Sequence, residues 1–212
     1  FEISATYNER GFKAAEAADC IAAMYQAILS YANILKIRGN TDEAEIQFRR
    51  AEKLREYFNN EWSVVKGTDM FAYAIDNKGK KHYKWKKMGK EIHGGETLKF
   101  IAYKNLSYEG ERTEKLLDYI HQCEFNPKTR EDNIESYTYL PDIFFRHGRS
   151  EEAWYWMKHI ISQKDLPHEH KSQGTNGDYP EISFTFISQV IEGMMGISVN
   201  ALTGEIIVNP CF

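Results

Sequence analysis

The sequence has too few cysteines for a disulfide framework or a structural zinc site. Its 212 residues include only three, Cys20, Cys123 and Cys211, and these lie far apart along the chain. Disulfide frameworks and zinc sites use even or clustered sets of cysteines. We therefore interpret the three as buried free thiols.

Long apolar runs are also missing. No run approaches the roughly 18–20 residues that are needed to cross a bilayer, so we expect no membrane association. There is no signal peptide, and the sequence begins with Phe1 rather than Met. We interpret it as a processed or excised piece of a longer protein, which leaves its cellular compartment open.

Motifs for phosphate, dinucleotide and serine-hydrolase chemistry are absent as well. The chain has no P-loop, no Gly-x-Gly-x-x-Gly fingerprint and no Gly-x-Ser-x-Gly elbow. Its net charge of −4 argues against a nucleic-acid partner. Residues 78–90 hold seven lysines among rings, but they straddle an expected turn. A solvated face that protects an edge strand explains these lysines better than a nucleic-acid patch does.

The sequence gives no support for a metal or another cofactor. His168 and His170 are two residues apart, as ligands on a strand can be. No other ligand type lies nearby at metal spacing, and the segment is not the His-Glu-x-x-His motif. We therefore expect no metal site and no cofactor, and we interpret the two histidines as hydrogen-bond partners for a substrate.

What the chain does have is helical periodicity. Apolar residues recur at the 3/4 spacing of one helix face over residues 21–35 and again over 44–58. Gly39 is expected to end the first helix, and Thr41 to cap the second. Residues 147–156 repeat this plan of glycine, hydroxyl, two acids and an aromatic. The sequence therefore predicts two αα-hairpins of one design.

The remaining segments complete an all-α prediction. Further helices are expected near residues 95–106, 111–123, 134–147, 150–163 and 181–196, which gives seven in total. The last is apolar over most of its circumference, as in a helix enclosed by others. Residues 70–75 and 80–85 alternate around a turn and predict a small inserted β-hairpin at about 69–86. We expect one helical-hairpin domain over residues 1–197 and a β-like tail over 198–212.

Carboxylates occur at the start of several of these helices. Glu96, Glu135, Asp178 and Glu181 each lie in or beside a polar or glycine-rich loop. Glycoside hydrolysis needs two facing carboxyls, one protonated and one ionised, and loops on one side of a helical assembly could bring such a pair together. For Glu96 an ordinary first-turn acid is the better interpretation, while for Glu181 a capping role is as good an explanation as a catalytic one.

Aromatic residues near these loops suit a carbohydrate ligand, because the C–H faces of sugars pack against rings. Tyr137 and Tyr179 stand next to the loop carboxylates and are the strongest candidates, and Trp85 is a further one. Trp154 and Trp156, which have helical spacing, are better explained as core residues.

Three segments carry a resemblance to a known family. Residues 43–63 resemble a helix that ends in a Phe-Asn-x-x-Trp segment, residues 137–161 a late helical hairpin, and residues 177–210 a final helix followed by a strand. Together they resemble the six-hairpin (α/α)6-toroid glycoside hydrolases of the rhamnosidase, trehalase and glucosidase kind. The similarity covers most of the chain in architecture, with loose motifs.

The resemblance implies inverting hydrolysis of a glycosidic bond in an oligo- or polysaccharide. It assigns Glu181 as general base, Glu135 as second carboxyl and Asp178 in support, with Glu96 as an alternative general acid. A full toroid has twelve helices, so seven imply an incomplete toroid, the C-terminal half of a catalytic domain whose N-terminal part is missing. An extracytoplasmic location is favoured if the parent degrades polysaccharides.

Two other functions stay open. A non-catalytic helical-repeat module would bind peptides or glycans on a concave face and would have no facing carboxylates. A toroid polysaccharide lyase would abstract a proton with a tyrosine or histidine, so that His168, His170 and Tyr179 would matter more than Glu181.

Overall fold

The computed structural model describes residues 14–85, 95–131, 133–168, 171–200 and 203–211. The chain divides into two compact units, Phe1–Arg130 and Glu131–Phe212, called unit 1 and unit 2 below. Both are mainly helical, as the sequence predicts, with small antiparallel β-sheets.

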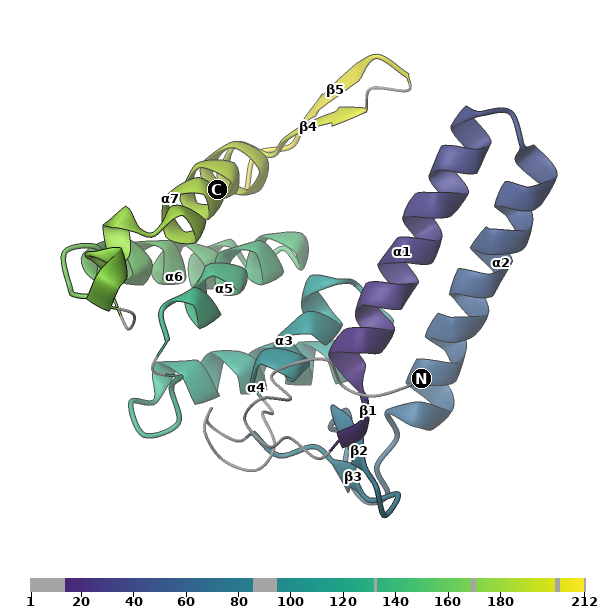
Figure 1. Cartoon of the computed structure of the whole chain (residues 1–212), viewed down its shortest axis with the longest axis horizontal. Helices are drawn as coiled ribbons and strands as arrows, with labels where there is room; N and C mark the ends of the chain where they lie inside the picture. The colour runs from purple at the N-terminus through teal and green to yellow at the C-terminus, as the bar shows by residue number, and fades with distance from the viewer. Residues whose placement is uncertain (1–13, 86–94, 132, 169–170, 201–202, 212) are drawn as a thin grey trace. The chain divides into compact units, whose positions relative to one another are not determined.

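Unit 1 is built around one long helical hairpin. Its elements are β1 (Ala14–Ala17), α1 (Ala18–Ile37), α2 (Thr41–Tyr57), the π-helix η2 (Phe58–Trp62), β2 (Ala74–Asp76), β3 (Lys81–His82), α3 (Gly95–Tyr103) and α4 (Glu111–Phe125). Helices α1 and α2 lie side by side and antiparallel (Figure 1). The predicted first αα-hairpin is confirmed.

The hairpin turns are made as predicted, whereas the helix starts are not. Gly39 has a φ of 81°, and the Asn40 N–H donates to the carbonyl of Leu35, which is the Schellman arrangement. The prediction that Thr41 caps α2 is wrong: Thr41 is the first residue of the helix, and Asn40 occupies the cap position without a side-chain hydrogen bond. The backbone hydrogen bond across Gly39 already fixes the turn, so the turn does not need a capping hydrogen bond from the Thr41 hydroxyl.

The inserted β-hairpin is present but shorter than expected. Strands β2 and β3 pair around a turn in which the Asp76 carboxylate accepts hydrogen bonds from the N–H groups of Lys78 and Lys80. A third strand, β1, pairs antiparallel with β2. Its sequence, Ala-Ala-Glu-Ala, has weak β-propensity, so a strand is not predicted there.

Asp76 yields a testable pH dependence. A hydrogen bond from His82, 3.0 Å from the carboxylate, and two backbone donors lower the pKa of Asp76 from 3.8 to about 2. A depressed pKa means that this stabilisation is fully present above pH 3.8 and is lost as the pH falls through about 2. We expect NMR titration of the Asp76 carboxyl to give a midpoint near 2. A midpoint near 3.8 would contradict the hairpin geometry.

Helix α1 corrects an expectation about membranes. One helix in the described part of the chain is long and apolar enough to cross a bilayer, judged by length and composition only. This helix is α1, with 20 residues. Polar residues such as Gln26 and Asn33 interrupt the apolar run in this segment. The mean hydropathy of α1 is nevertheless high. Core helices of water-soluble proteins pass the same test, so the finding alone does not assign a membrane span.

Unit 2 contains the second helical hairpin. Its elements are α5 (Glu135–Arg146), α6 (Ser150–Ser162), the 3-10 turns η3 (Lys171–Gln173) and η4 (Asn176–Asp178), α7 (Pro180–Ser188), the π-helix η5 (Gln189–Met194), β4 (Ile197–Asn200) and β5 (Glu205–Val208). Gly148, with a φ of 70°, turns α5 into α6, and Arg149 donates to Phe144 as Asn40 does to Leu35. The shared design of the two hairpins is confirmed.

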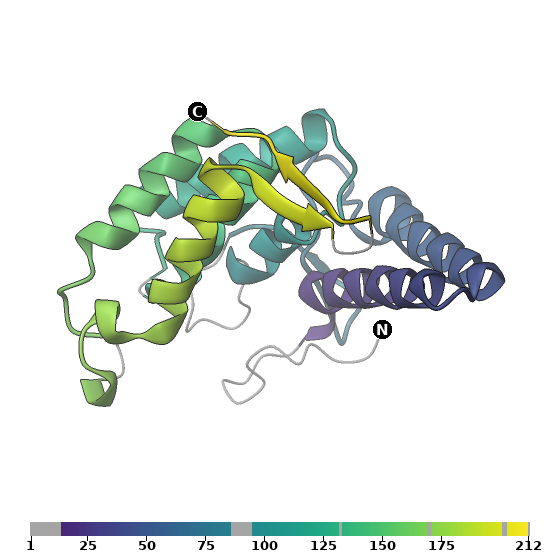
Figure 2. The same ribbon diagram turned by 90° about the horizontal axis from the view of Figure 1, so that it is seen from above.

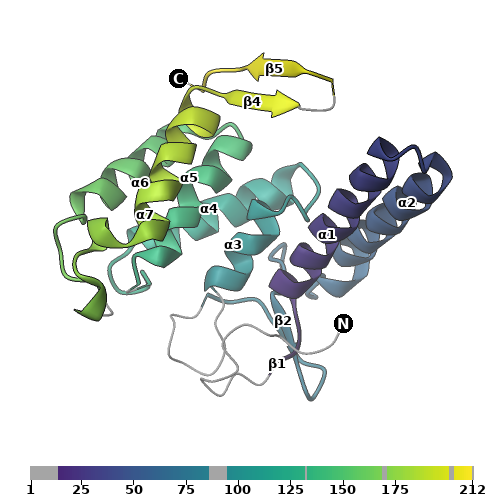
Figure 3. The same cartoon turned by 45° about the horizontal axis from the view of Figure 1, so that its top comes forward.

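The end of unit 2 differs from the expected enclosed helix. Helix α7 continues into η5, and the β4–β5 hairpin extends from its end (Figures 2 and 3). Phe184 and Ile187 are 71% and 57% exposed, and only Ile182 of α7 is buried. The expectation of an enclosed helix is therefore wrong for the described residues, because α7 packs only one side, against α5.

Candidate functional site

The polar loop before α7 is tied to the end of α6. The N–H of Gly177 donates to the carbonyl of Lys164 at 2.7 Å, and that of Asn176 to the carbonyl of Leu166 at 2.8 Å. Further along, the N–H of His168 donates to the carbonyl of Gly174 at 3.0 Å. These bonds bring His168 and the start of α7 to one place in unit 2.

Asp178 is used to build this loop. Its Oδ2 atom accepts hydrogen bonds from the backbone N–H and the hydroxyl of Thr175, at 2.9 and 2.8 Å, in a reciprocal capping box. These bonds lower the pKa of Asp178. A Cβ at Gly174 would stand 2.7 Å from the same oxygen, which explains the glycine there. The structure thus gives Asp178 a capping role.

Glu135 begins α5 and is held by two hydrogen-bond donors. The Asn133 amide donates to its Oε2 at 3.2 Å, while Asn133 Oδ1 accepts from the Glu135 N–H at 2.9 Å. The second donor is the hydroxyl of Tyr179, and this bond raises the pKa of Tyr179 to about 12. Tyr179 is therefore a neutral donor at ordinary pH, and Glu135 is an acceptor for both partners.

His168 completes the cluster. Its side chain is buried, and its ring stacks on that of Tyr179 with centroids 4.4 Å apart. Its Nε2 atom lies 3.6 Å from Glu135 Oε1, which is an ion-pair distance rather than a hydrogen bond. Glu135, His168 and Tyr179, which the sequence nominated separately, are therefore in mutual contact. We call them the Glu135 cluster.

Glu181 lies at the edge of this cluster. It is exposed in the first turn of α7, and its charge contributes to the raised pKa of Tyr179, as does Tyr139. The Tyr179 hydroxyl is therefore within electrostatic range of two carboxylates, Glu135 and Glu181.

The other nominated residues lie elsewhere. Tyr137 is buried, donates its hydroxyl to the carbonyl of Glu131 and stacks on Trp156 with centroids 5.9 Å apart. Glu96 and Trp85 belong to unit 1: Glu96 is buried in the first turn of α3, and the indole of Trp85 donates to the carbonyl of Thr129 at 3.0 Å. His170 lies outside the described residues.

Sequence reasoning did not nominate Asn133, and it placed Tyr139 among the rings near the carboxylate loops without preferring it. Asn133 could have been found, since an asparagine two residues before a helical glutamate is a common capping signal. Tyr139 lies four residues after Glu135, so on a helix both side chains lie on one face. The part of the chain that the structure describes holds no group of three or more His, Cys, Asp or Glu side chains suited to a metal ion.

The bond between Tyr179 and Glu135 predicts a measurable shift. Replacing Glu135 with Gln removes the acceptor charge that is the main cause of the raised pKa of Tyr179. We expect the Tyr179 pKa to fall from about 12 toward the ordinary value of about 10. NMR titration of ring-labelled tyrosine measures this. An unchanged titration of Tyr179 would show that the hydroxyl does not donate to Glu135.

Comparisons of the chain with protein-family models, with curated protein sequences and with solved structures find no match. The geometry of the Glu135 cluster and the sequence resemblance are therefore the grounds for a functional proposal.

Proposed function

We propose that the protein is a glycoside hydrolase that cleaves a glycosidic bond of an oligo- or polysaccharide, as part of an (α/α)6-toroid catalytic domain. The observation that carries the proposal is the Glu135 cluster, in which His168 Nε2 lies 3.6 Å from Glu135 Oε1 and the His168 ring stacks on Tyr179. Glycosidases place two carboxyls around the scissile bond. No metal or other cofactor is required by this chemistry.

The surroundings of the two carboxyls support different roles. The Asn133 amide donates to Glu135 Oε2, and Glu135 stands at the N-terminus of α5, where the helix dipole favours negative charge. Glu135 is therefore our choice for the base that activates water. This exchanges the roles that the resemblance implies, and it leaves Glu181, exposed in the first turn of α7, as the second carboxyl.

The ring pair beside the carboxyls suits a sugar. Tyr179 is half-buried and stacked on His168. The neighbouring Tyr139, partly exposed on α5, adds a second tyrosine. Rings of this kind present the flat apolar surface against which sugar C–H groups pack, and the Tyr179 hydroxyl supplies a donor for a substrate oxygen.

The raised pKa of Tyr179 favours hydrolysis over elimination. A lyase would need a tyrosine or histidine that gives up its proton readily. With a pKa of about 12, Tyr179 is a weak acid whose deprotonated form is scarce near neutral pH. We therefore rank hydrolysis above proton abstraction by Tyr179.

A substrate screen with two variants tests the proposal. The protein is incubated with a panel of plant and bacterial oligosaccharides, and new reducing ends are measured. We expect cleavage that Glu181→Gln lowers strongly and Asp178→Asn leaves near the wild-type rate, since asparagine can also serve as a cap. Cleavage that persists at the wild-type rate in Glu181→Gln would remove Glu181 from the reaction.

A further inference from the structure

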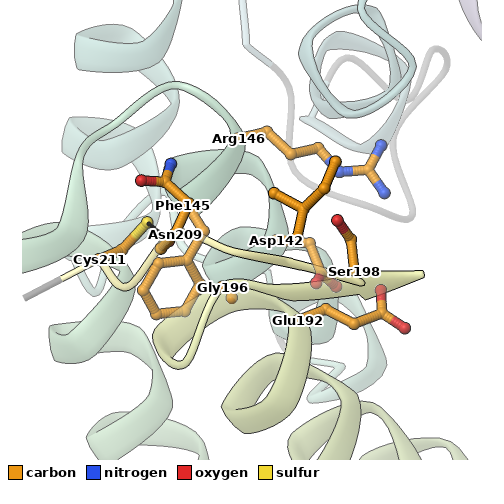
Figure 4. Close-up of a pocket in the computed structure, with 10 residues that line it drawn as sticks. Asp142, Phe145, Arg146, Glu192, Gly196, Ser198, Asn209 and Cys211 are labelled. Atoms are coloured by element: carbon orange, nitrogen blue, oxygen red, sulfur yellow. Dashed lines mark hydrogen bonds between the residues drawn. The ribbon is translucent and has the colours of Figure 1, made fainter. Parts of the chain in front are cut away.

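Unit 2 also has a pocket whose lining contains no residue of the Glu135 cluster. A pocket of about 370 Å³ lies between α5, η5 and the β4–β5 hairpin (Figure 4). Its lining comprises Asp142, Phe145, Arg146, Glu192, Gly193, Gly196, Ser198, Ile207, Asn209 and Cys211. The volume is at the lower end of the range for small-molecule sites.

The pocket wall depends on two glycines. A Cβ at Gly193 would stand 2.3 Å from the Phe145 ring, so glycine is needed for that ring to lie against η5. A Cβ at Gly196 would stand 1.8 Å from the carbonyl oxygen of Asn209, whose N–H donates to Gly196 at 3.0 Å. The Cys211 N–H donates to Met194 at 3.0 Å and ties the tail to η5. The wall is thus a close-packed structure.

The π-helix adds a second sign of a built site. Helix α7 changes to π geometry at Gln189, whose side chain is 1% exposed. Its amide donates to the carbonyl of Thr138 at 2.7 Å and to Asp142 Oδ2 at 3.2 Å. This places the Asp142 carboxylate at the pocket. π-Helical turns occur frequently at functional sites because they re-aim side chains.

The charges at the pocket are of both signs. Burial raises the pKa of Asp142 most. The positive charge of Arg146 lowers this pKa, and the negative charge of Glu192 raises it. In Figure 4 the guanidinium of Arg146 and the carboxylate of Glu192 lie apart, with Ser198 between them in that view. The Phe145 ring and Ile207 supply apolar lining. A ligand that matches this lining carries a positive group, a negative group and an apolar part.

We propose that this pocket binds a small zwitterion, an α-amino acid with an apolar side chain. The ammonium group lies between Asp142 and Glu192, and the carboxylate is held by Arg146, whose planar fork of donors suits it. The side chain packs on Phe145. The proposal stands independently of glycosidase activity, since it uses none of the residues of the Glu135 cluster.

Cys211 provides a reporter for this pocket. It lines the cavity and is partly exposed, whereas Cys123 lies in unit 1. The rates at which iodoacetamide alkylates Cys211 and Cys123 are measured by peptide mass spectrometry. Alanine, leucine or phenylalanine is added up to 50 mM in separate series. We expect leucine or phenylalanine to slow alkylation of Cys211 in a saturable manner and to leave Cys123 unchanged.

Matched ligands and matched variants decide between outcomes. 3-Methylbutylamine and 4-methylpentanoate, which keep the apolar part of leucine but lack one charge, should protect at least tenfold more weakly. Glu192→Gln and Arg146→Gln should each weaken protection about tenfold, while Glu151→Gln and Lys158→Gln, on α6, should not. The proposal is overturned by no protection from any of the three amino acids, by equal protection from the amine or the acid, or by unchanged protection in either pocket variant. The comparison of ligands on the wild-type protein holds even if a variant fails to fold.

Discussion

Replacing Glu135 with Gln is expected to lower the rate of glycoside hydrolysis by about 10²–10⁴-fold, the usual contribution of one general acid or base. Glutamine keeps the size of the side chain and can still accept a hydrogen bond from Tyr179, but it cannot take a proton from water. The measurement is kcat on the best substrate from the screen, with the circular dichroism spectrum as a check on folding.

The matched control for this variant is Asp178→Asn. Asp178 is also a loop carboxylate, but its Oδ2 accepts two hydrogen bonds from Thr175. We expect this variant to lose less than threefold in kcat. If Glu135→Gln retains full activity, or if both variants lose activity equally, the assignment of Glu135 to the reaction is wrong.

The second large effect concerns the stability of unit 1. Lys99 and Glu124 form an ion pair in which both side chains are 0% exposed, and the ammonium lies 5.6 Å from the centroid of the Trp85 ring. Lys99→Met leaves the charge of Glu124 buried without its partner. Breaking a buried pair in this way costs about 3–5 kcal/mol. Urea denaturation followed by tryptophan fluorescence should show this loss.

The double variant separates the charge from the packing. Lys99→Met combined with Glu124→Leu replaces both charges with apolar groups, and such replacements are often neutral or stabilising. We expect the double variant to recover most of the stability that Lys99→Met loses. A single variant that loses less than about 1 kcal/mol, or a double variant no more stable than the single one, would show that the pair is not buried as described.

The helical framework was predictable because its signals are local. Apolar residues at the 3/4 spacing and a glycine after each helix define both αα-hairpins, and Gly39 and Gly148 take the left-handed conformation that only glycine adopts without strain. The helix starts were not predictable, because Thr41 and Ser150 are the first residues of α2 and α6 rather than their caps. The hydrogen bonds across the glycines had already set the turn, so the hydroxyls fell inside the helices.

The candidate site was predictable in its residues and not in their roles. Glu135 was nominated as a carboxylate at the start of a helix, His168 as a hydrogen-bond partner for a substrate, and Tyr179 as a ring next to the loop carboxylates. Asp178 accepts a hydrogen bond from Thr175, whereas the neighbouring Tyr179 interacts with Glu135. These directions depend on the backbone path through Gly174. Adjacent side chains in a loop can point in opposite directions, and sequence spacing carries no information on which direction each takes.

The pocket at η5 could not be foreseen for a different reason. The segment that contains Gln189 and Gly193 has the composition of an apolar helix, and the change from α to π geometry does not alter its apolar pattern. A buried glutamine within such a run was the available signal, because a buried amide needs partners. Thr138 and Asp142 are those partners.

The central claim is that this protein hydrolyses a glycosidic bond by activating water beside Glu135. Cleavage of the best glycan substrate in water enriched in ¹⁸O tests it most directly, with mass spectrometry of the products. Hydrolysis predicts one ¹⁸O atom at the new reducing end in the wild-type reaction and a loss of this product in Glu135→Gln. An unsaturated product without ¹⁸O, or no cleavage that depends on Glu135, would contradict the claim.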